Sequence, residues 1–171
     1  ISATGSGKTY LAAFDALNFN PDRLLYIVHE GSILKKSLET FQKVFGGSKT
    51  CGLYNAEAKE TEEDFLFSTN VSMCRSLELF DKKEFDYIII DTSPSLGSLT
   101  INALSAADSV IITVNPQLLA MMGLQDFLKT TKKIQKRINS KLEIKGILLT
   151  MCDSRTNLSK VLSEQMSEAY D

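Results

Sequence analysis

The sequence predicts an α/β fold with a mainly parallel sheet, arranged as a three-layer sandwich. Apolar runs of strand length alternate with amphipathic stretches of helix length, which is typical of a sheet with helices on both faces. A second observation is chemical: a glycine-containing loop at residues 2–9 precedes a predicted helix, and Asp91 ends an apolar run. Such loops and carboxylates are typical of domains that bind phosphate groups.

Length and composition favour one domain over residues 1–171. The 171 residues are 43% hydrophobic, and a chain of this size buries about 70% of its surface when it folds. A net charge of −2 argues against a bulk basic surface for nucleic acid. The three cysteines lack CxxC spacing, which favours reduced thiols and a cytoplasmic location. No run approaches the ~18 apolar residues of a membrane span, so we expect no membrane partner.

Each strand is expected where apolar and β-branched residues run together between turn signals. The run Leu24–Val28 is continuous enough for a buried parallel strand and follows a turn at Pro21. Residues 55–64 carry many charges and no large apolar side chain, so they predict a solvated loop rather than an acidic binding site. The predicted strands, in order, are 24–28, 51–54, 65–69, 85–91, 110–114 and 144–150.

Helices are expected where apolar residues recur at helical spacing and capping residues flank the segment. Ser32 is a candidate N-cap for the second helix, and Gly46-Gly47 ends that helix because glycine adopts the left-handed conformation of a C-cap. The predicted helices are 8–18, 32–44, 75–80, 124–138 and 158–170.

The loop at residues 2–9 reads Ser-Ala-Thr-Gly-Ser-Gly-Lys-Thr and fits the P-loop pattern GxxxxGK[ST], except that Ser2 replaces the first glycine. Its glycines let successive backbone N–H groups turn toward a phosphate. Lys8 is predicted to contact the β- and γ-phosphates, while Thr9 and Asp91 are predicted to hold Mg²⁺. The sequence therefore predicts a P-loop NTPase fold with ATP or ADP and Mg²⁺ as cofactors. The nucleotide-binding residues of these motifs are Gly5, Ser6, Gly7, Lys8, Thr9 and Asp91.

Four segments of the first half form a recognisable set: the loop at 2–9, Tyr26-Ile-Val-His29, Phe67-Ser-Thr69, and the strand that ends at Asp91. Over residues 1–91 they resemble the first motor domain of superfamily 2 helicases of the restriction-enzyme type. That family follows its aspartate with Glu-Ala-His, whereas Thr92-Ser93-Pro94 stands here. The resemblance does not extend to a second motor domain with arginine fingers, so we do not expect helicase activity.

The second half has a different set of motifs: Asp91-Thr-Ser-Pro-Ser-Leu-Gly97, Val114-Asn-Pro116 and Gly146-Ile-Leu-Leu-Thr-Met151. Over about residues 85–171 these resemble ParA/Soj partition ATPases, and the resemblance implies that Pro116 and Met151 lie on the adenine side of the nucleotide. That family's signature P-loop lysine would fall at Ser2, and His29-Glu30-Gly31 replaces its acidic catalytic motif. We therefore expect nucleotide binding with weak or no hydrolysis, and no catalytic residue is assigned.

The change of resemblance near Asp91 predicts an engineered chimera of a helicase-like half (1–91) and a ParA-like half (92–171). The strand at 86–91 is then expected at the centre of the sheet beside the P-loop strand, because the later strands bring partition-type neighbours. Three functions stay open: a nucleotide-binding domain with weak or no hydrolysis, an active partition-type ATPase, and an inert scaffold that binds no nucleotide. We favour the first.

Two partner interpretations also stay open. A basic stripe on the predicted helix 124–138 could contact DNA, but its spacing is equally that of a solvated helix face, which we favour. Only Ile1 precedes the loop, and if no strand stands before Ser2, we expect the chain to be weakly stable or to fill the gap by strand exchange with a second copy. The stripe consists of Lys129, Lys132, Lys133, Lys136 and Arg137.

Overall fold

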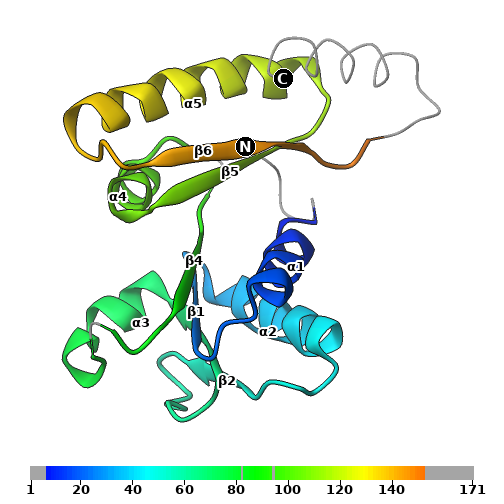
Figure 1. Ribbon diagram of the computed structural model, residues 1–171, viewed down its shortest axis with the longest axis vertical. Helices are drawn as coiled ribbons and strands as arrows, with labels where there is room; N and C mark the ends of the chain where they lie inside the picture. The colour runs from blue at the N-terminus through cyan, green and yellow to red at the C-terminus, as the bar shows by residue number, and fades with distance from the viewer. Residues whose placement is uncertain (1–6, 82, 94, 153–171) are drawn as a thin grey trace. The chain divides into compact units, whose positions relative to one another are not determined.

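The computed structural model describes residues 7–81, 83–93 and 95–152 (Figure 1). The described residues divide into two compact units: one lies within Lys8–Thr92, and the other holds Gly7, Ser93 and residues 95–152. The division falls next to the junction predicted from the sequence. A single domain over residues 1–171 stays a prediction, and the helix expected at 158–170 lies outside the described residues.

The first unit is built on a four-stranded parallel sheet with the strand order β2-β3-β1-β4. The register places Val28 opposite both Thr69 and Asp91, so three strands end at the same edge of the sheet. Within the described residues β4 pairs only with β1, and its expected central position stays a prediction. The strands are β1 (Leu24–Val28), β2 (Cys51–Tyr54), β3 (Phe65–Thr69) and β4 (Tyr87–Asp91).

Helices cover both faces of this sheet. The alternation of β1 explains the layers, because Leu24, Tyr26 and Val28 belong to the core beneath α1 and α2, whereas Leu25 belongs to the core on the α3 side. The 3-10 turn η1 lies next in the chain after α3. The bounds are α1 (Lys8–Phe19), α2 (Gly31–Phe45), α3 (Asn70–Cys74) and η1 (Leu77–Leu79).

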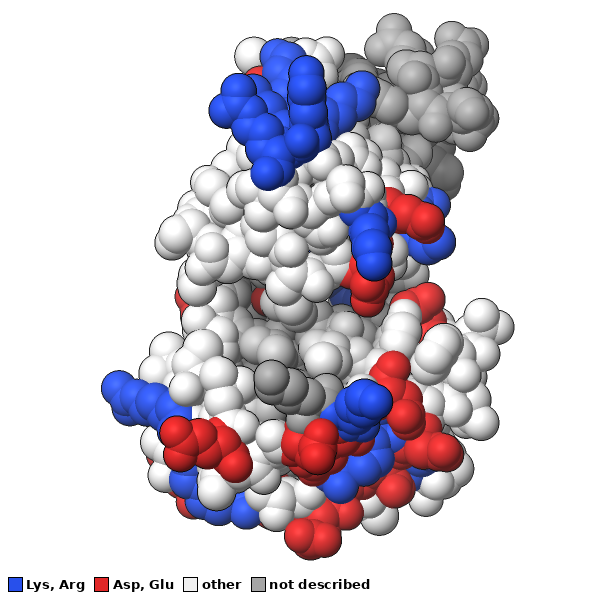
Figure 2. Space-filling model, turned by 60° about the vertical axis from the view of Figure 1, so that its left-hand side comes forward, with Lys and Arg blue, Asp and Glu red and all other residues white. Residues whose placement is uncertain are grey.

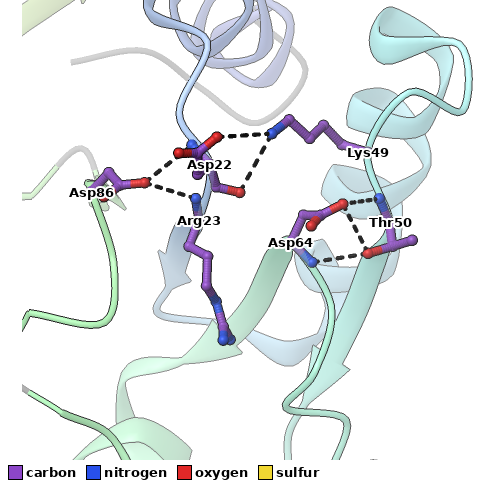
Figure 3. Close-up of polar contacts among 6 residues, drawn as sticks. All are labelled: Asp22, Arg23, Lys49, Thr50, Asp64 and Asp86. Atoms are coloured by element: carbon purple, nitrogen blue, oxygen red, sulfur yellow. Dashed lines mark hydrogen bonds and ion pairs between the residues drawn. The ribbon is translucent and has the colours of Figure 1, made fainter.

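Two aspartates fasten the amino-terminal ends of the strands (Figure 3). Asp86 Oδ2 accepts hydrogen bonds from the backbone N–H groups of Asp22 and Arg23, at 3.0 and 2.9 Å. Asp64 Oδ2 accepts from both the N–H and the hydroxyl of Thr50, at 2.8 and 3.1 Å. The hydrogen bond from the Thr50 backbone is the main reason that the pKa of Asp64 lies below its usual value. These contacts lie at the edge of the sheet opposite to Asp91.

The second unit contains a parallel pair of strands, β5 (Ser109–Val114) and β6 (Glu143–Leu149), with α4 (Ser98–Ala106) and α5 (Leu118–Arg137). The two strands keep a parallel register with one irregularity between Val110 and Ile111. Side chains of α4, α5 and both strands form one core. Its buried members are Leu104, Ile112, Val114, Leu124, Phe127, Ile134 and Leu142.

The predicted α/β class with a mainly parallel sheet is confirmed, and every strand bound lies within two residues of its prediction. The helices required corrections. The Ser32 side chain does not cap α2, because the helix begins at Gly31 with Glu30 at the capping position. The helix expected at 75–80 is replaced by α3 and η1, since the Thr69 side chain caps α3 by accepting from Ser72 N–H. Helix α4 was not predicted.

Candidate functional site

Lys8 and Asp91 meet at the carboxyl-terminal edge of the four-stranded sheet. Lys8 is the first residue of α1 and Asp91 is the last residue of β4, and Lys8 Nζ lies 3.4 Å from Asp91 Oδ1. Both side chains are largely shielded, with 25% and 15% of their surfaces exposed. The amino terminus of α1 adds unpaired N–H groups and the positive end of a helix dipole at Lys8. This arrangement suits a phosphate group.

The second oxygen of Asp91 is held by Tyr26. The Tyr26 hydroxyl donates a hydrogen bond to Asp91 Oδ2 at 3.2 Å. Burial, and next the charge of Asp91, raise the pKa of Tyr26 far above its usual range, while the hydroxyls of Thr9 and Ser37 act in the opposite direction. The sequence analysis gave Tyr26 no role. The sequence feature that points to Tyr26 is its position as a single phenol in an otherwise aliphatic predicted strand, close to the end of that strand.

Gly7 adopts φ +82°, which L side chains rarely tolerate, although a Cβ there would meet no atom within 4 Å. Backbone conformation, not space, is therefore the reason for glycine at this position. The other two predicted loop residues, Gly5 and Ser6, lie outside the described residues. Their part in phosphate binding stays a prediction.

The donors present fit a magnesium ion shared with phosphates. Thr9 offers a hydroxyl and Asp91 a carboxylate, which are the hard oxygen ligands that Mg²⁺ prefers. Among the described residues no group of three or more His, Cys, Asp or Glu side chains could hold a metal by itself. Mg²⁺ suits a site with few protein ligands, because it keeps several waters and takes others from substrate phosphates.

Pro116 and Met151 follow neighbouring strands of the second unit. The N–H of Thr150 donates to the carbonyl of Val114 at 2.8 Å, so the chain segments after β5 and β6 lie side by side. Pro116 is buried, whereas Met151 is 59% exposed and has a positive φ of 57°. Their predicted place beside an adenine stays a prediction, since Lys8 and Asp91 belong to the other unit.

Two polar atoms at the Asp91 edge of the sheet are buried without a partner among the described residues. They are His29 Nδ1 and Asn70 Oδ1, which follow β1 and β3 directly. The other ring nitrogen of His29 lies 3.6 Å from Glu30 Oε1. Asn70 was missed by the sequence analysis, although its place after a predicted strand was a signal.

The basic stripe lies on the solvent-exposed side of α5. Figure 2 shows Lys and Arg side chains gathered over the carboxyl-terminal part of this helix. The opposite side buries Leu124, Phe127, Thr131 and Ile134, so α5 is amphipathic. The stripe therefore has the placement that a solvated helix face requires, and DNA contact stays a prediction.

A comparison with protein families finds a match in the middle of the chain. A family model described as "AAA domain" matches residues 50–144. The match includes Asp91 and Pro116, begins after Lys8 and Thr9, and crosses the junction predicted near residue 91.

Curated relatives include the sporulation initiation inhibitor protein Soj of Bacillus subtilis (strain 168). It is 48% identical over 103 residues, which are 60% of this chain and 40% of Soj. The chromosome partitioning protein ParA of Myxococcus xanthus (strain DK1622) is 47% identical over 83 residues, which are 48% of this chain and 29% of that protein. The chain thus spans less than half the length of these relatives. Neither is a helicase.

Solved structures extend the similarity of fold along the whole chain. Cobyrinic acid a,c-diamide synthase from Mycobacterium smegmatis covers 99% of this chain, which covers 78% of it, with a TM-score of 0.61 and 24% identity. A plasmid partition protein from Borrelia burgdorferi covers 96% of this chain, which covers 81% of it, with a TM-score of 0.63 and 22% identity. Identities this low support the fold alone, and they confirm the predicted P-loop NTPase fold.

No helix in the described ranges is long and apolar enough to cross a membrane. The family match covers more than half of the chain, and the proteins named Soj and ParA are 48% and 47% identical to it over their matched residues. The chain therefore belongs to the AAA domain family of P-loop proteins and is ParA/Soj-like.

Proposed function

We propose that this chain is a nucleotide-binding domain of the ParA/Soj type that binds ATP or ADP together with Mg²⁺ and hydrolyses ATP weakly or not at all. One observation carries the proposal: the ion pair of Lys8 with Asp91 at the start of α1 and the end of β4. This arrangement matches the chemistry of a magnesium-bound polyphosphate. The cation and the helix amino terminus suit the phosphates, and the carboxylate at the carboxyl edge of the parallel sheet suits the magnesium ion.

Each residue has a distinct task in this proposal. Lys8 would leave Asp91 and place its charge on the phosphates, while the first N–H groups of α1 would donate to them. Thr9 and Asp91 would hold Mg²⁺, which when bound neutralises phosphate charge. Gly7 would keep the loop in its left-handed turn. Gly5 and Ser6 would contribute backbone N–H groups.

Weak hydrolysis follows from the residues around Asp91. Thr92 and Ser93 follow the aspartate where a water-orienting acid would be needed. The nearby Glu30 is exposed and faces His29 instead. An arginine finger contributes about 10³–10⁵ to the rate of phosphoryl transfer, and the proposed site has none among the described residues.

Relatives support the choice of ligand. Structures of the cobyrinic acid a,c-diamide synthase hold ADP with magnesium and an ATP analogue with magnesium. Soj and ParA share about half of their matched residues with this chain. By this likeness, Pro116 and Met151 are proposed to contact the adenine. Self-association is a secondary part of the same proposal, whereas the basic stripe of α5 is proposed to be a solvated helix face, with DNA contact as the alternative.

A composite origin with a helicase-like first half stays a proposal with one structural argument in its favour. The boundary between the two compact units falls at Thr92, beside the predicted junction. The family match across residues 50–144 argues in the other direction, because it continues through that boundary. Nucleotide binding does not depend on which origin is correct.

Calorimetric titration with ATP and ADP in Mg²⁺ tests the proposal. We expect binding by the unmutated chain, a loss of at least about tenfold in Lys8→Ala, and no change in Lys36→Ala, an exposed lysine of α2 whose side chain has no described partner. Absence of binding by the unmutated chain would favour an inert scaffold. Robust phosphate release that disappears in Lys8→Ala would instead favour an active partition-type ATPase.

A further inference from the structure

We propose that Tyr26 is a positioning residue of the phosphate site, whose hydroxyl orients the Asp91 carboxylate for magnesium. This inference rests on the proposed function. It concerns a residue that the P-loop motif does not contain, because Tyr26 lies in β1 rather than in the loop or in β4.

The ring of Tyr26 is fixed by its surroundings. The residue is 1% exposed, and its ring centroid lies 5.3 Å from that of Phe41 and 5.5 Å from that of Phe67. Its backbone belongs to a strand that pairs on both sides, with β3 and with β4. The hydroxyl therefore has a defined position from which it reaches Asp91 Oδ2 at 3.2 Å.

Asp91 is held by two different contacts. Lys8 engages Oδ1 and Tyr26 engages Oδ2. Under the proposed function Lys8 moves to the phosphates, so its contact with Asp91 weakens when nucleotide binds. The contact from Tyr26 does not compete with phosphate and persists.

Tyr26 keeps its proton while it does this. A buried phenol needs a hydrogen-bond partner, and a carboxylate is a strong one. A phenol has an ordinary pKa of about 10, so the hydroxyl keeps its proton at neutral pH and remains a donor to Asp91.

The inference predicts a defect that depends on the metal. Contacts of Lys8 and of the α1 amino terminus with phosphate do not need Mg²⁺. A carboxylate that has lost the Tyr26 hydrogen bond can rotate, and its alignment with a metal then costs free energy. Removal of the hydroxyl should weaken the contribution of Mg²⁺ to nucleotide affinity and leave the metal-independent part intact.

The test compares Tyr26→Phe with Tyr54→Phe, using calorimetric titration of ADP in Mg²⁺ and in EDTA. Tyr54 is 2% exposed and belongs to the core on the opposite face of the same sheet, so its variant loses the hydroxyl of a similarly buried tyrosine away from the site. We expect Tyr26→Phe to weaken ADP binding about tenfold in Mg²⁺ and to change it less than about twofold in EDTA. Tyr54→Phe should change neither affinity.

Other outcomes distinguish the alternatives. An equal loss in Mg²⁺ and in EDTA would show that Tyr26 acts through packing, and no loss would also overturn the inference. If the unmutated chain binds no ADP, the proposed function fails first. A double-mutant cycle distinguishes the proposed role from a general loss of stability. In an Asp91→Asn background, Tyr26→Phe should cause no further loss of the effect of Mg²⁺ on ADP affinity.

Discussion

Lys8 Nζ and Asp91 Oδ1 lie 3.4 Å apart, joining the start of the first helix to the end of the last strand of their sheet. The ammonium group that the proposed function assigns to phosphate therefore has a carboxylate as its partner. Nucleotide binding exchanges one anion for another at Lys8. The affinity for nucleotide consequently contains the cost of breaking this pair.

Asp91→Asn should separate that cost from the metal contribution. Partly exposed ion pairs are worth about 0.2–1 kcal/mol, so we expect ADP binding in EDTA to tighten by up to about fivefold. In Mg²⁺ the same variant should bind ADP more weakly than the unmutated chain, because a magnesium ligand is lost. Calorimetric titration in both buffers measures the two effects. Weaker binding in EDTA would show that Asp91 helps to hold Lys8 in place for phosphate.

Asp86→Asn should destabilise the first unit by about 1 kcal/mol, since the carboxylate accepts two backbone N–H groups at the start of β1. Glu57→Gln is the matched control, because Glu57 is exposed and its carboxylate has no hydrogen bond or ion pair in the described ranges. Urea denaturation followed by circular dichroism measures the difference. Equal midpoints for the two variants would contradict a structural role for Asp86.

Asp64 should make stability depend on pH in the acidic range. Its pKa in the folded chain is lowered, chiefly by the hydrogen bond from the Thr50 backbone, so its contribution is complete above the unfolded pKa of about 4. The contribution is lost as pH falls through the lower folded pKa. Asp64→Asn should therefore be less stable than the unmutated chain at pH 7 and should approach it near about pH 2. A destabilisation that stays constant over this range, measured by thermal unfolding, would refute the assignment.

Gly46→Ala should cost about 1 kcal/mol of stability, because Gly46 ends α2 with φ +58° and donates its N–H to Gln42. Gly31→Ala, at the other end of the helix, should be neutral or slightly stabilising. Gly31 has no positive φ, and a Cβ there would come no closer than 4.0 Å to another side chain. The denaturant midpoint of Gly46→Ala should therefore fall, whereas that of Gly31→Ala should stay the same or rise slightly.

Sequence alone predicted the strands well because their signal is local. The run Leu24–Val28 reads as a strand from its own composition, and Asp91 marks the end of another. Helix α4 was not predicted because it buries only Thr100 and Leu104 and its sequence shows little amphipathic pattern. The role of Tyr26 could not be predicted, since it depends on the pairing of β1 with β4, which local sequence does not specify.

The position of β1 between β3 and β4 also has a consequence for how the chain is made. Both partners of this strand come later in the sequence, and its pairing with β4 reaches Asp91. On the ribosome, Leu24–Val28 emerges before either of its partner strands. Its pairing with β4 cannot be completed until residue 91 has left the exit tunnel. Such non-local parallel pairing is slow and exposes apolar strand edges to aggregation. Nascent fragments that stop before β4 are therefore expected to aggregate more readily than the completed first unit.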